Sequence, residues 1–172
     1  METLSELYER SFPDDERIPF QHLLNTLNDE RIMAAVFHEE ELVGMYFLFL
    51  HRKLVYLSYI CVREEDQDKG YGTAILEKIR KDYEGWRIVV DIEEVREEDE
   101  NYAQEISRRH FYTKNGFVST GVFYHIYGVD YELLSFGGNV KQEEWHELIS
   151  KHWGSRFADT AVYKRKDSII ES

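Results

Sequence analysis

Two glycines, Gly70 and Gly72, stand where a run of strand character gives way to a helical pattern. Residues 56–62 are rich in Tyr, Leu, Ile and Val, and the apolar residues after the glycines recur at helical spacing. A glycine-containing loop that opens a helix leaves backbone N–H groups unpaired at the positive end of the helix dipole. The sequence therefore predicts an anion site, such as a phosphate site, around residues 67–73.

Two common nucleotide-binding loops do not fit these residues. The dinucleotide-binding fingerprint needs a third glycine, and Ile75 occupies its place. A P-loop needs the sequence Gly-Lys-Ser or Gly-Lys-Thr, which does not follow here. The ligand of the loop must therefore be inferred from other features of the chain.

Helical and strand patterns alternate in a way that indicates a mixed α/β fold. The three strand patterns within residues 31–62 are joined by short polar connections, which predicts an antiparallel meander. The expected helices are residues 3–11, a second helix starting at Pro19, and residues 70–85, 102–114 and 141–153. The expected strands are residues 31–38, 42–50, 53–62, 86–93, 117–126, 129–135 and 157–163.

The composition is that of a folded, acidic protein. The 172 residues are 42% hydrophobic and 15% aromatic, which suits one domain with a substantial core. The 34 acidic and 21 basic residues give a formal net charge of −13, which repels nucleic acid and attracts cations, or serves solubility alone. Because no long apolar run and no signal-peptide pattern occurs, we expect a cytoplasmic protein that binds neither nucleic acid nor a membrane.

Cysteine and histidine usage points away from metal and disulfide chemistry. Cys61 is the only cysteine, which excludes an internal disulfide and a cysteine-rich zinc site. A single strand cysteine is more often a small buried side chain than a nucleophile. The seven histidines form no His-x-x-x-His pair, so we expect no metal.

Two motifs together resemble the GNAT superfamily of N-acetyltransferases. Residues 67–72 read Gln-x-x-Gly-x-Gly after a strand, similar to the pyrophosphate loop of members that bind acetyl-CoA. Residues 111–117 read Phe-Tyr-x-x-x-Gly-Phe, similar to the end of the helix that follows the central crossing point of that fold. The resemblance implies an α/β (α+β) fold with a mixed, mostly antiparallel central sheet flanked by helices.

The resemblance covers about residues 3–135 and departs from the family at both ends. The family usually has a strand before its first helix, and no residues remain for it here, so that strand is missing or supplied from elsewhere. We expect residues 1–135 to form an acetyl-CoA-binding N-acetyltransferase domain. Residues 136–172 would form a C-terminal helix–strand extension packed on the same domain.

The resemblance also implies a set of contacts with acetyl-CoA. Backbone groups of Ile60 and Val62, on a strand that splays from its neighbour, would bind the pantetheine and the thioester carbonyl. Backbone N–H groups of residues 68–73 would surround the pyrophosphate, because glycine lacks a Cβ and permits close approach. Lys69 would add a charge to a phosphate or remain a solvated loop lysine. The cofactor-binding candidates are Ile60, Cys61, Val62, Gln67, Asp68, Lys69, Gly70, Tyr71, Gly72 and Thr73.

The catalytic candidates implied by the resemblance are Tyr112, Glu93 and Asp91. Many members keep a tyrosine at the position of Tyr112 as the general acid for the CoA thiolate, and a phenol remains protonated near neutral pH. The alternative is an aromatic ring packed at a helix end. Members often use a glutamate on the strand equivalent to residues 86–93 as the base, directly or through water, and we favour Glu93. Either carboxylate could instead pair with Arg108 or Arg109.

One departure concerns the pantetheine. The family often has an asparagine about two helical turns before the tyrosine. Glu105 stands at that spacing and Asn101 lies one turn earlier, which leaves this contact in doubt.

We expect an enzyme that transfers an acetyl group from acetyl-CoA to a primary amine by direct attack in a ternary complex. The acceptor would be a small, cationic molecule or a peptide amine. Glu16 and Arg17, in the loop bordering the acceptor side of the fold, are candidate substrate contacts or ordinary surface charges. The alternative is a non-catalytic CoA-binding or ligand-sensing module on the same fold. The identity of the amine, and whether the protein is a homodimer, stay open.

Overall fold

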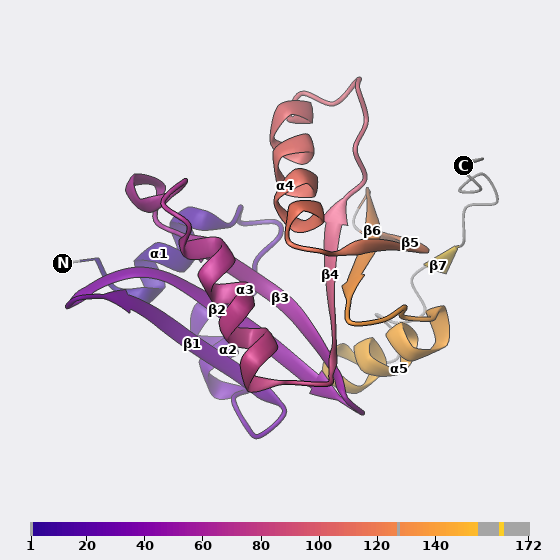
Figure 1. Cartoon of the computed structure of the whole chain (residues 1–172), viewed down its shortest axis with the longest axis horizontal. Coiled ribbons are helices and arrows are strands. Elements are labelled where there is room, and N and C mark those ends of the chain that lie inside the picture. The colour runs from indigo at the N-terminus through magenta and orange to yellow at the C-terminus, as the bar shows by residue number, and fades with distance from the viewer. Residues whose placement is uncertain (1, 127, 155–161, 164–172) are drawn as a thin grey trace. The chain divides into compact units, whose positions relative to one another are not determined.

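The computed structural model of the chain describes residues 2–126, 128–154 and 162–163. The chain divides into two compact units, residues 1–84 and residues 85–172. Each unit combines helices with antiparallel strands, which confirms the predicted mixed α/β class (Figure 1).

Two helices open the first unit. Helix α1 (Leu4–Ser11) begins with a capping box in which the Thr3 hydroxyl accepts a hydrogen bond from the Glu6 N–H at 3.3 Å. In return, the Glu6 carboxylate accepts a hydrogen bond from the Thr3 N–H at 2.8 Å. Helix α2 (Phe20–Asn25) follows Pro19 directly, as the sequence predicts.

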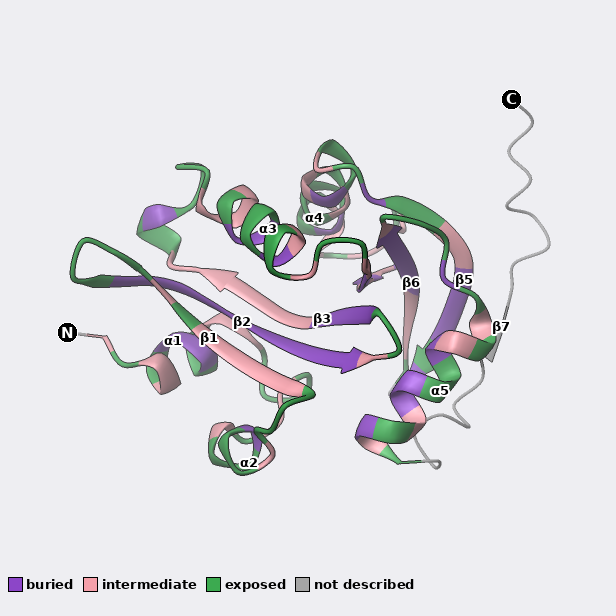
Figure 2. Cartoon of the chain, turned by 60° about the horizontal axis from the view of Figure 1, so that its bottom comes forward, coloured by how far each residue is buried: buried purple, intermediate pink, exposed green. Residues whose placement is uncertain are grey.

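Three strands form the predicted antiparallel meander of the first unit: β1 (Arg31–His38), β2 (Glu41–His51) and β3 (Leu54–Val62). Strand β2 is buried along most of its length, whereas β1 is half-buried to exposed (Figure 2). The turn between β2 and β3 consists of Arg52 and Lys53, whose φ values of 46° and 58° suit a two-residue hairpin.

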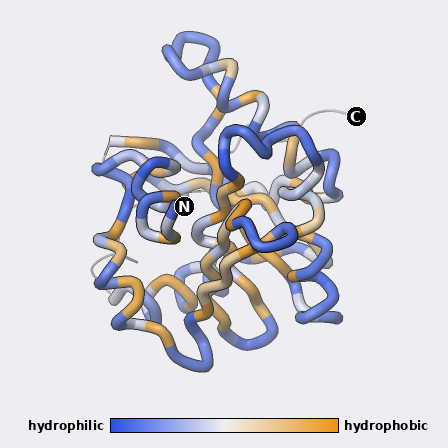
Figure 3. The backbone as a smooth tube through the Cα atoms, turned by 90° about the vertical axis from the view of Figure 1, so that its left-hand side faces the viewer, coloured by the Kyte–Doolittle hydropathy of each residue, from blue (hydrophilic) through white to orange (hydrophobic). Residues whose placement is uncertain are grey.

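Helix α3 (Tyr71–Asp82) lies on one face of this meander, and α1 and α2 lie on the other (Figures 1 and 2). The buried residues of α3 are Ile75, Leu76 and Ile79, which are the residues that the helical spacing places on one face. Figure 3 shows hydrophobic (orange) and hydrophilic (blue) segments alternating along the backbone, with many of the outer loops hydrophilic. The core of the first unit therefore lies between the meander and its helices.

The second unit is built around four strands that pair antiparallel with their neighbours. In spatial order they are β4 (Arg87–Glu93), β6 (Val129–Phe136), β5 (Val118–Ile126) and β7 (Val162–Tyr163). Helices α4 (Tyr102–Lys114) and α5 (Gln142–Trp153) lie on opposite sides of these strands (Figures 1 and 2). Helix α4 ends before Gly116, whose φ of 84° suits a helix-terminating glycine.

The C-terminal helix α5 packs within the second unit. The Trp145 ring centroid lies 5.6 Å from that of Tyr124, and the Arg87 guanidinium donates a hydrogen bond of 2.6 Å to Glu144. The last predicted strand is described only at its end, where Val162–Tyr163 form β7, and residues 157–161 lie outside the described residues. The division of the chain at residue 135 stays a prediction.

Candidate active site

The loop after β3 passes twice through left-handed backbone before α3 begins. Asp68 has a φ of 61° and Gly70 a φ of 88°. A Cβ added to Gly70 would meet no atom within 4 Å, so the backbone conformation, not lack of space, calls for glycine there. The first turn of α3 has neither an acidic residue nor a side-chain cap. Within its first turn, the positive end of the helix is therefore free of carboxylates, and the acidic residues Asp66 and Asp68 stand in the loop before it.

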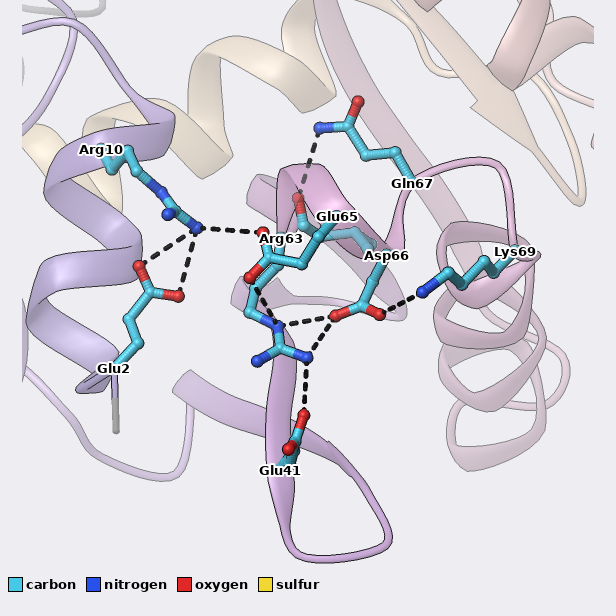
Figure 4. A network of polar contacts seen from close by, with 9 residues as sticks. Glu2, Arg10, Glu41, Arg63, Glu65, Asp66, Gln67 and Lys69 are labelled. Carbon is cyan, nitrogen blue, oxygen red and sulfur yellow. Dashed lines mark hydrogen bonds and ion pairs between the residues drawn. The ribbon is translucent and has the colours of Figure 1, made fainter.

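A buried carboxylate, Asp66, holds this loop together (Figure 4). Its side chain is 8% exposed and accepts hydrogen bonds from the Arg63 guanidinium at 2.6 Å and the Lys69 ammonium at 2.9 Å. The hydrogen bond from Lys69, with that from Arg63, holds the pKa of Asp66 below its usual range. The charge of Lys69, a predicted phosphate contact, is therefore shared with Asp66.

Further ion pairs surround this centre and connect it to the rest of the first unit (Figure 4). Arg63 lies 3.2 Å from Glu41, at the start of β2, and 3.7 Å from Glu65. Arg10 of α1 lies 3.1 Å from Glu2 and 3.8 Å from Glu65. Exposed pairs of this kind stabilise a protein by less than about 1 kcal/mol each, so their main effect is to restrict the loop.

Gln67, a predicted cofactor contact, links the loop of residues 63–70 to the end of β3. Its side-chain amide donates a hydrogen bond of 3.4 Å to the carbonyl oxygen of Val62, the last residue of β3 (Figure 4). The contacts of Asp68, Tyr71, Gly72 and Thr73 with a pyrophosphate stay predictions. Asp66 was missed by the sequence analysis, although its spacing of three residues from both Arg63 and Lys69 could have suggested it.

Strand β3 contains a β-bulge just before residues 60–62, which are predicted to bind acetyl-CoA. In the pairing with β2, Tyr59 opposes Phe47 and Leu57 opposes Leu48, which leaves Ser58 as an extra residue. Such a bulge bends and twists a strand and redirects the residues that follow it. The bulge at Ser58 therefore changes the direction of the last three residues of β3. The proposed contacts of their backbone groups with acetyl-CoA stay predictions.

Gly44 sets the distance between β2 and the end of β3. A Cβ at Gly44 would lie 2.6 Å from the carbonyl oxygen of Cys61 and 3.5 Å from Ile75 of α3. Only glycine therefore permits this approach. Burial raises the pKa of the Cys61 thiol, so the thiolate needed for nucleophilic attack is disfavoured. Gly44 carries no motif of its own, so sequence alone gave no signal for it.

The predicted acceptor-side loop is fastened to its own unit. The Arg17 guanidinium donates a hydrogen bond of 2.8 Å to the Phe12 carbonyl oxygen and forms an ion pair with Asp14. The backbone carbonyl of Glu16 accepts a hydrogen bond from the Tyr59 hydroxyl at 3.3 Å, while the Glu16 residue is exposed. Arg17 therefore orders the loop, and substrate contacts for either residue stay predictions.

Tyr112, the predicted general acid, is 5% exposed in the second unit. Its ring meets those of Phe111 and Phe117 edge-on, with centroid distances of 5.1 and 5.4 Å. Burial raises the pKa of the phenol, the negative charge of Asp91 adds to the rise, and the positive charge of Arg108 opposes it. The hydroxyl has no hydrogen-bond partner among the described residues. Tyr112 is thus a phenol that stays protonated at neutral pH, and its role as the general acid stays a prediction.

The two candidate bases have different partners. Asp91 accepts a hydrogen bond from the Tyr124 hydroxyl. Glu93 accepts a hydrogen bond of 2.9 Å from the Asn101 side-chain amide, and its other oxygen lies 3.8 Å from Arg108. The pairing with Arg108 that the sequence left open is therefore present, but at a long distance.

Two other carboxylates of the second unit, Glu132 and Glu105, are buried and have closer partners than Glu93 has in Arg108. Arg109 pairs with buried Glu132, and not with the candidate bases. Buried Glu105 accepts a hydrogen bond of 3.1 Å from the backbone N–H of Arg96. Burial raises the pKa of Glu105, and the nearby charges of Asp99 and Glu93 add to the rise. Glu105 therefore holds the acidic loop before α4, which accounts for a carboxylate where the family often has asparagine.

Neither a metal-binding cluster nor a membrane-spanning helix occurs within residues 2–126, 128–154 and 162–163. In that part of the chain, no group of three or more His, Cys, Asp or Glu residues is arranged to hold a metal ion. No helix there is long and apolar enough to cross a membrane.

Solved structures with the same fold include several acetyltransferases. A GNAT-family protein from Bacteroides thetaiotaomicron matches with a TM-score of 0.68 and 19% identity, over 87% of this chain and 89% of that one. The aminoglycoside 6′-N-acetyltransferase of Enterococcus faecium matches with a TM-score of 0.60 and 16% identity, over 77% and 87%. The ribosomal-protein-S18-alanine N-acetyltransferase of Escherichia coli gives 0.57 and 12%, over 81% and 92%. Likeness at these identities shows the fold.

Sequence comparison identifies the family directly. No curated protein sequence matches the chain. The family model of the acetyltransferase (GNAT) domain matches residues 28–119, which is more than half of the chain and includes the glycine loop and Tyr112. The chain therefore belongs to the GNAT family of acetyltransferases.

Proposed function

We propose that the protein transfers an acetyl group from acetyl-CoA to a primary amine. The observation that carries this proposal is the loop of residues 67–73, which opens α3 within a GNAT domain through two left-handed residues. Such a helix start suits a pyrophosphate. A solved GNAT structure from Elizabethkingia anophelis with the same fold holds acetyl-CoA, and the matched aminoglycoside acetyltransferase structures include a complex with coenzyme A.

The proposed chemistry needs a neutral amine, a stabilised oxyanion and a protonated leaving group. Glu93 takes the proton of the ammonium, directly or through water, and the lone pair attacks the thioester carbonyl. Backbone N–H groups at the end of β3 stabilise the oxyanion. The C–N bond forms, the C–S bond breaks, and Tyr112 gives its proton to the departing thiolate. The attacking nitrogen then loses its second proton to the Tyr112 oxygen, directly or through water, which leaves a neutral amide and restores the phenol.

Asp91 is the second candidate base and the less suitable one. Its carboxylate already accepts the hydroxyl hydrogen of Tyr124, whereas one oxygen of Glu93 has only a distant arginine among its described contacts. The Asn101 amide fixes the other oxygen of Glu93 and thus the direction of the carboxylate. We therefore keep Glu93 as the base and Asp91 as a neighbouring charge.

The formal charge of −13 favours a cationic acceptor. The named relatives act on an aminoglycoside and on the alanine of a ribosomal protein, so the shared fold accommodates small-molecule and protein amines. An acidic surface attracts the ammonium but also raises its pKa, so attraction and deprotonation oppose each other. We therefore expect the kcat/KM of a true acceptor to rise with pH through the neutral range.

Two measurements test the proposal. CoA at 100 times its Kd should stabilise the folded protein by about 2.7 kcal/mol. Release of the CoA thiol from acetyl-CoA should depend on an added amine. No change of melting temperature in millimolar CoA would overturn the proposal. A shift without thiol release for any amine would instead support the non-catalytic CoA-binding module.

A further inference from the structure

A stacked pair of tyrosines lies beside the two candidate bases. The ring centroids of Tyr124 and Tyr131 are 5.1 Å apart, and the ring planes differ by 15°. Tyr124 donates its hydroxyl hydrogen to Asp91, and Tyr131 stands directly opposite Glu93 in the pairing of β4 with β6. We call these four residues the tyrosine–carboxylate cluster.

The register of the strands places this cluster on one face of the sheet of the second unit. Residues directly opposite each other in antiparallel strands point to the same face, and their Cβ atoms lie about 4.5–5.5 Å apart. Glu93 opposes Tyr131 across one strand pair, and Tyr131 opposes Tyr124 across the next. Carboxylates and rings from three neighbouring strands are therefore side by side.

The cluster is buried at one end and partly exposed at the other. Tyr124 is buried and packs against buried Trp145, with ring centroids 5.6 Å apart. Tyr131 and Glu93 are only half-buried. Packing alone would explain the buried ring of Tyr124. It would not explain why the ring of Tyr131 lies beside the partly exposed carboxylate of Glu93.

The charge of Glu93 is also less neutralised than that of its neighbour on the other face. Glu132 forms a close, two-pronged pair with Arg109. Glu93 has a neutral amide as its near partner, and its arginine lies 3.8 Å away. Glu93 therefore retains negative charge that a cationic ligand could meet.

An aromatic ring next to a carboxylate suits one kind of ligand. The face of a tyrosine ring attracts cations and stacks on flat apolar groups, and the carboxylate binds the ammonium. The Cβ atoms of opposed residues such as Glu93 and Tyr131 lie about 5 Å apart. A ligand can span this distance with a short carbon chain between its amine and its ring.

We propose that Tyr131 selects the acetyl acceptor as a primary amine carried by a short chain on an aromatic or similarly flat apolar group. The inference rests on the proposed acetyl transfer, because Glu93 serves in both. Tyr131 contacts the apolar part of the acceptor and takes no part in the proton transfers. Polyhydroxylated amines and amines on polar chains are the poorer acceptors.

The test compares 2-phenylethylamine with ethanolamine, which share a two-carbon amine and differ in the ring. Thiol release should show a kcat/KM at least about tenfold higher for 2-phenylethylamine, a difference of about 1.4 kcal/mol. Tyr131→Leu should reduce this ratio about tenfold by raising KM for 2-phenylethylamine, whereas Tyr131→Phe should keep it. Phe37→Leu is the matched control, because Phe37 is 60% exposed on β1 of the first unit, and it should leave the ratio unchanged.

The outcomes separate the two proposals. Equal kcat/KM for the two amines, or an unchanged ratio in Tyr131→Leu, would overturn the selection by Tyr131 while leaving acetyl transfer intact. If neither amine releases thiol, calorimetric titration of 2-phenylethylamine into the CoA-loaded protein decides. If 2-phenylethylamine binds and Tyr131→Leu weakens its binding, the role of Tyr131 in selecting the ligand is supported even without acetyl transfer. If 2-phenylethylamine does not bind, the selection by Tyr131 is overturned.

Discussion

The phosphate-loop region of the first unit and the tyrosine–carboxylate region of the second unit are built by different means. In the loop, the left-handed conformations of Asp68 and Gly70 and the start of α3 set the arrangement of backbone donors. Charged side chains there mostly pair with one another around Asp66. In the second unit, the groups with proposed chemical roles are side chains, held by buried rings and by hydrogen bonds from neighbouring strands.

The difference suggests how each region responds to substitution. A site made of backbone N–H groups tolerates most side-chain changes but not a change in glycine or in strand spacing. A site made of side chains loses its function when a single atom is removed. Variants of the first unit should therefore alter CoA binding, and variants of the second unit should alter turnover.

The largest effect is expected from Tyr112→Phe, which removes only the phenolic oxygen. If Tyr112 protonates the thiolate, turnover should fall by about 10²–10⁴-fold, the usual scale for a positioned general acid. The Kd for acetyl-CoA, measured by titration calorimetry, should stay the same because the packed ring remains.

Tyr102→Phe provides the matched control, since it removes a phenolic oxygen from the first turn of the same helix. Its turnover should equal that of the parent protein. Equal turnover in Tyr112→Phe and the parent would remove Tyr112 from the mechanism and leave the second unit without an identified acid.

The next largest effect is expected from Gly72→Glu in the first turn of α3. The new side chain places bulk and negative charge where the pyrophosphate should bind. The stabilisation by CoA, about 2.7 kcal/mol at 100 times the parent Kd, should disappear in a melting experiment. Lys81→Glu, a larger charge change at the far end of α3, should retain the shift. Retention of the shift in Gly72→Glu would place the pyrophosphate elsewhere.

A smaller effect is expected from Gly44→Ala, which tests strand spacing. The added Cβ would lie 2.6 Å from the Cys61 carbonyl oxygen, so β3 must move. Overpacking of this kind costs about 1–3 kcal/mol in the free energy of unfolding. Urea unfolding measures that cost, and the Kd for CoA should rise because the end of β3 is displaced. Gly70→Ala makes no clash, so its penalty should come from the positive φ alone. Parent-like stability and Kd in Gly44→Ala would show that the strand adjusts freely.

Local patterns were sufficient to predict most of the elements. The capping box at Thr3 and the glycine after α4 gave helix ends directly, and helix 102–114 was predicted with the bounds that the structure shows. Hydrophobic runs with short connections predicted the meander, although Glu41 and His51 belong to β2 and not to the connections. Such signals lie within a few residues of one another, so sequence displays them.

The contacts that organise the candidate site were harder to predict. The bond from Tyr124 to Asp91 joins residues far apart in sequence and depends on the register of two strand pairs. The requirement for glycine at position 44 depends on the pairing of β2 with β3. The local sequence does not determine how these strands align with one another, because tertiary packing selects their register.

The smallest effect is expected from Glu144→Gln, which weakens the tie between α5 and β4. Hydrogen bonding from Arg87, opposed by partial burial, lowers the pKa of Glu144 to about 2 from an ordinary value of 4.5. A carboxylate with a lowered folded-state pKa stabilises the protein above its unfolded-state pKa, and this stabilisation is lost as the pH falls toward the folded-state value. Because the Glu144 side chain is 36% exposed, solvent screening limits the effect to about 0.5–1 kcal/mol at pH 7.

Urea unfolding of the parent and of Glu144→Gln should therefore differ at pH 7 and converge as the pH falls from about 4.5 toward 2. Glu143→Gln, at the exposed neighbouring position, should show almost no difference at either pH. A gap that stays constant down to pH 2.5 would mean that geometry, not charge, gives Glu144 its effect. The CoA-dependent shift at pH 7 should be the same in both variants and the parent, because the pair lies in the second unit and CoA binding is assigned to the loop of the first. A lost shift in Glu144→Gln would contradict the division of labour between the two regions.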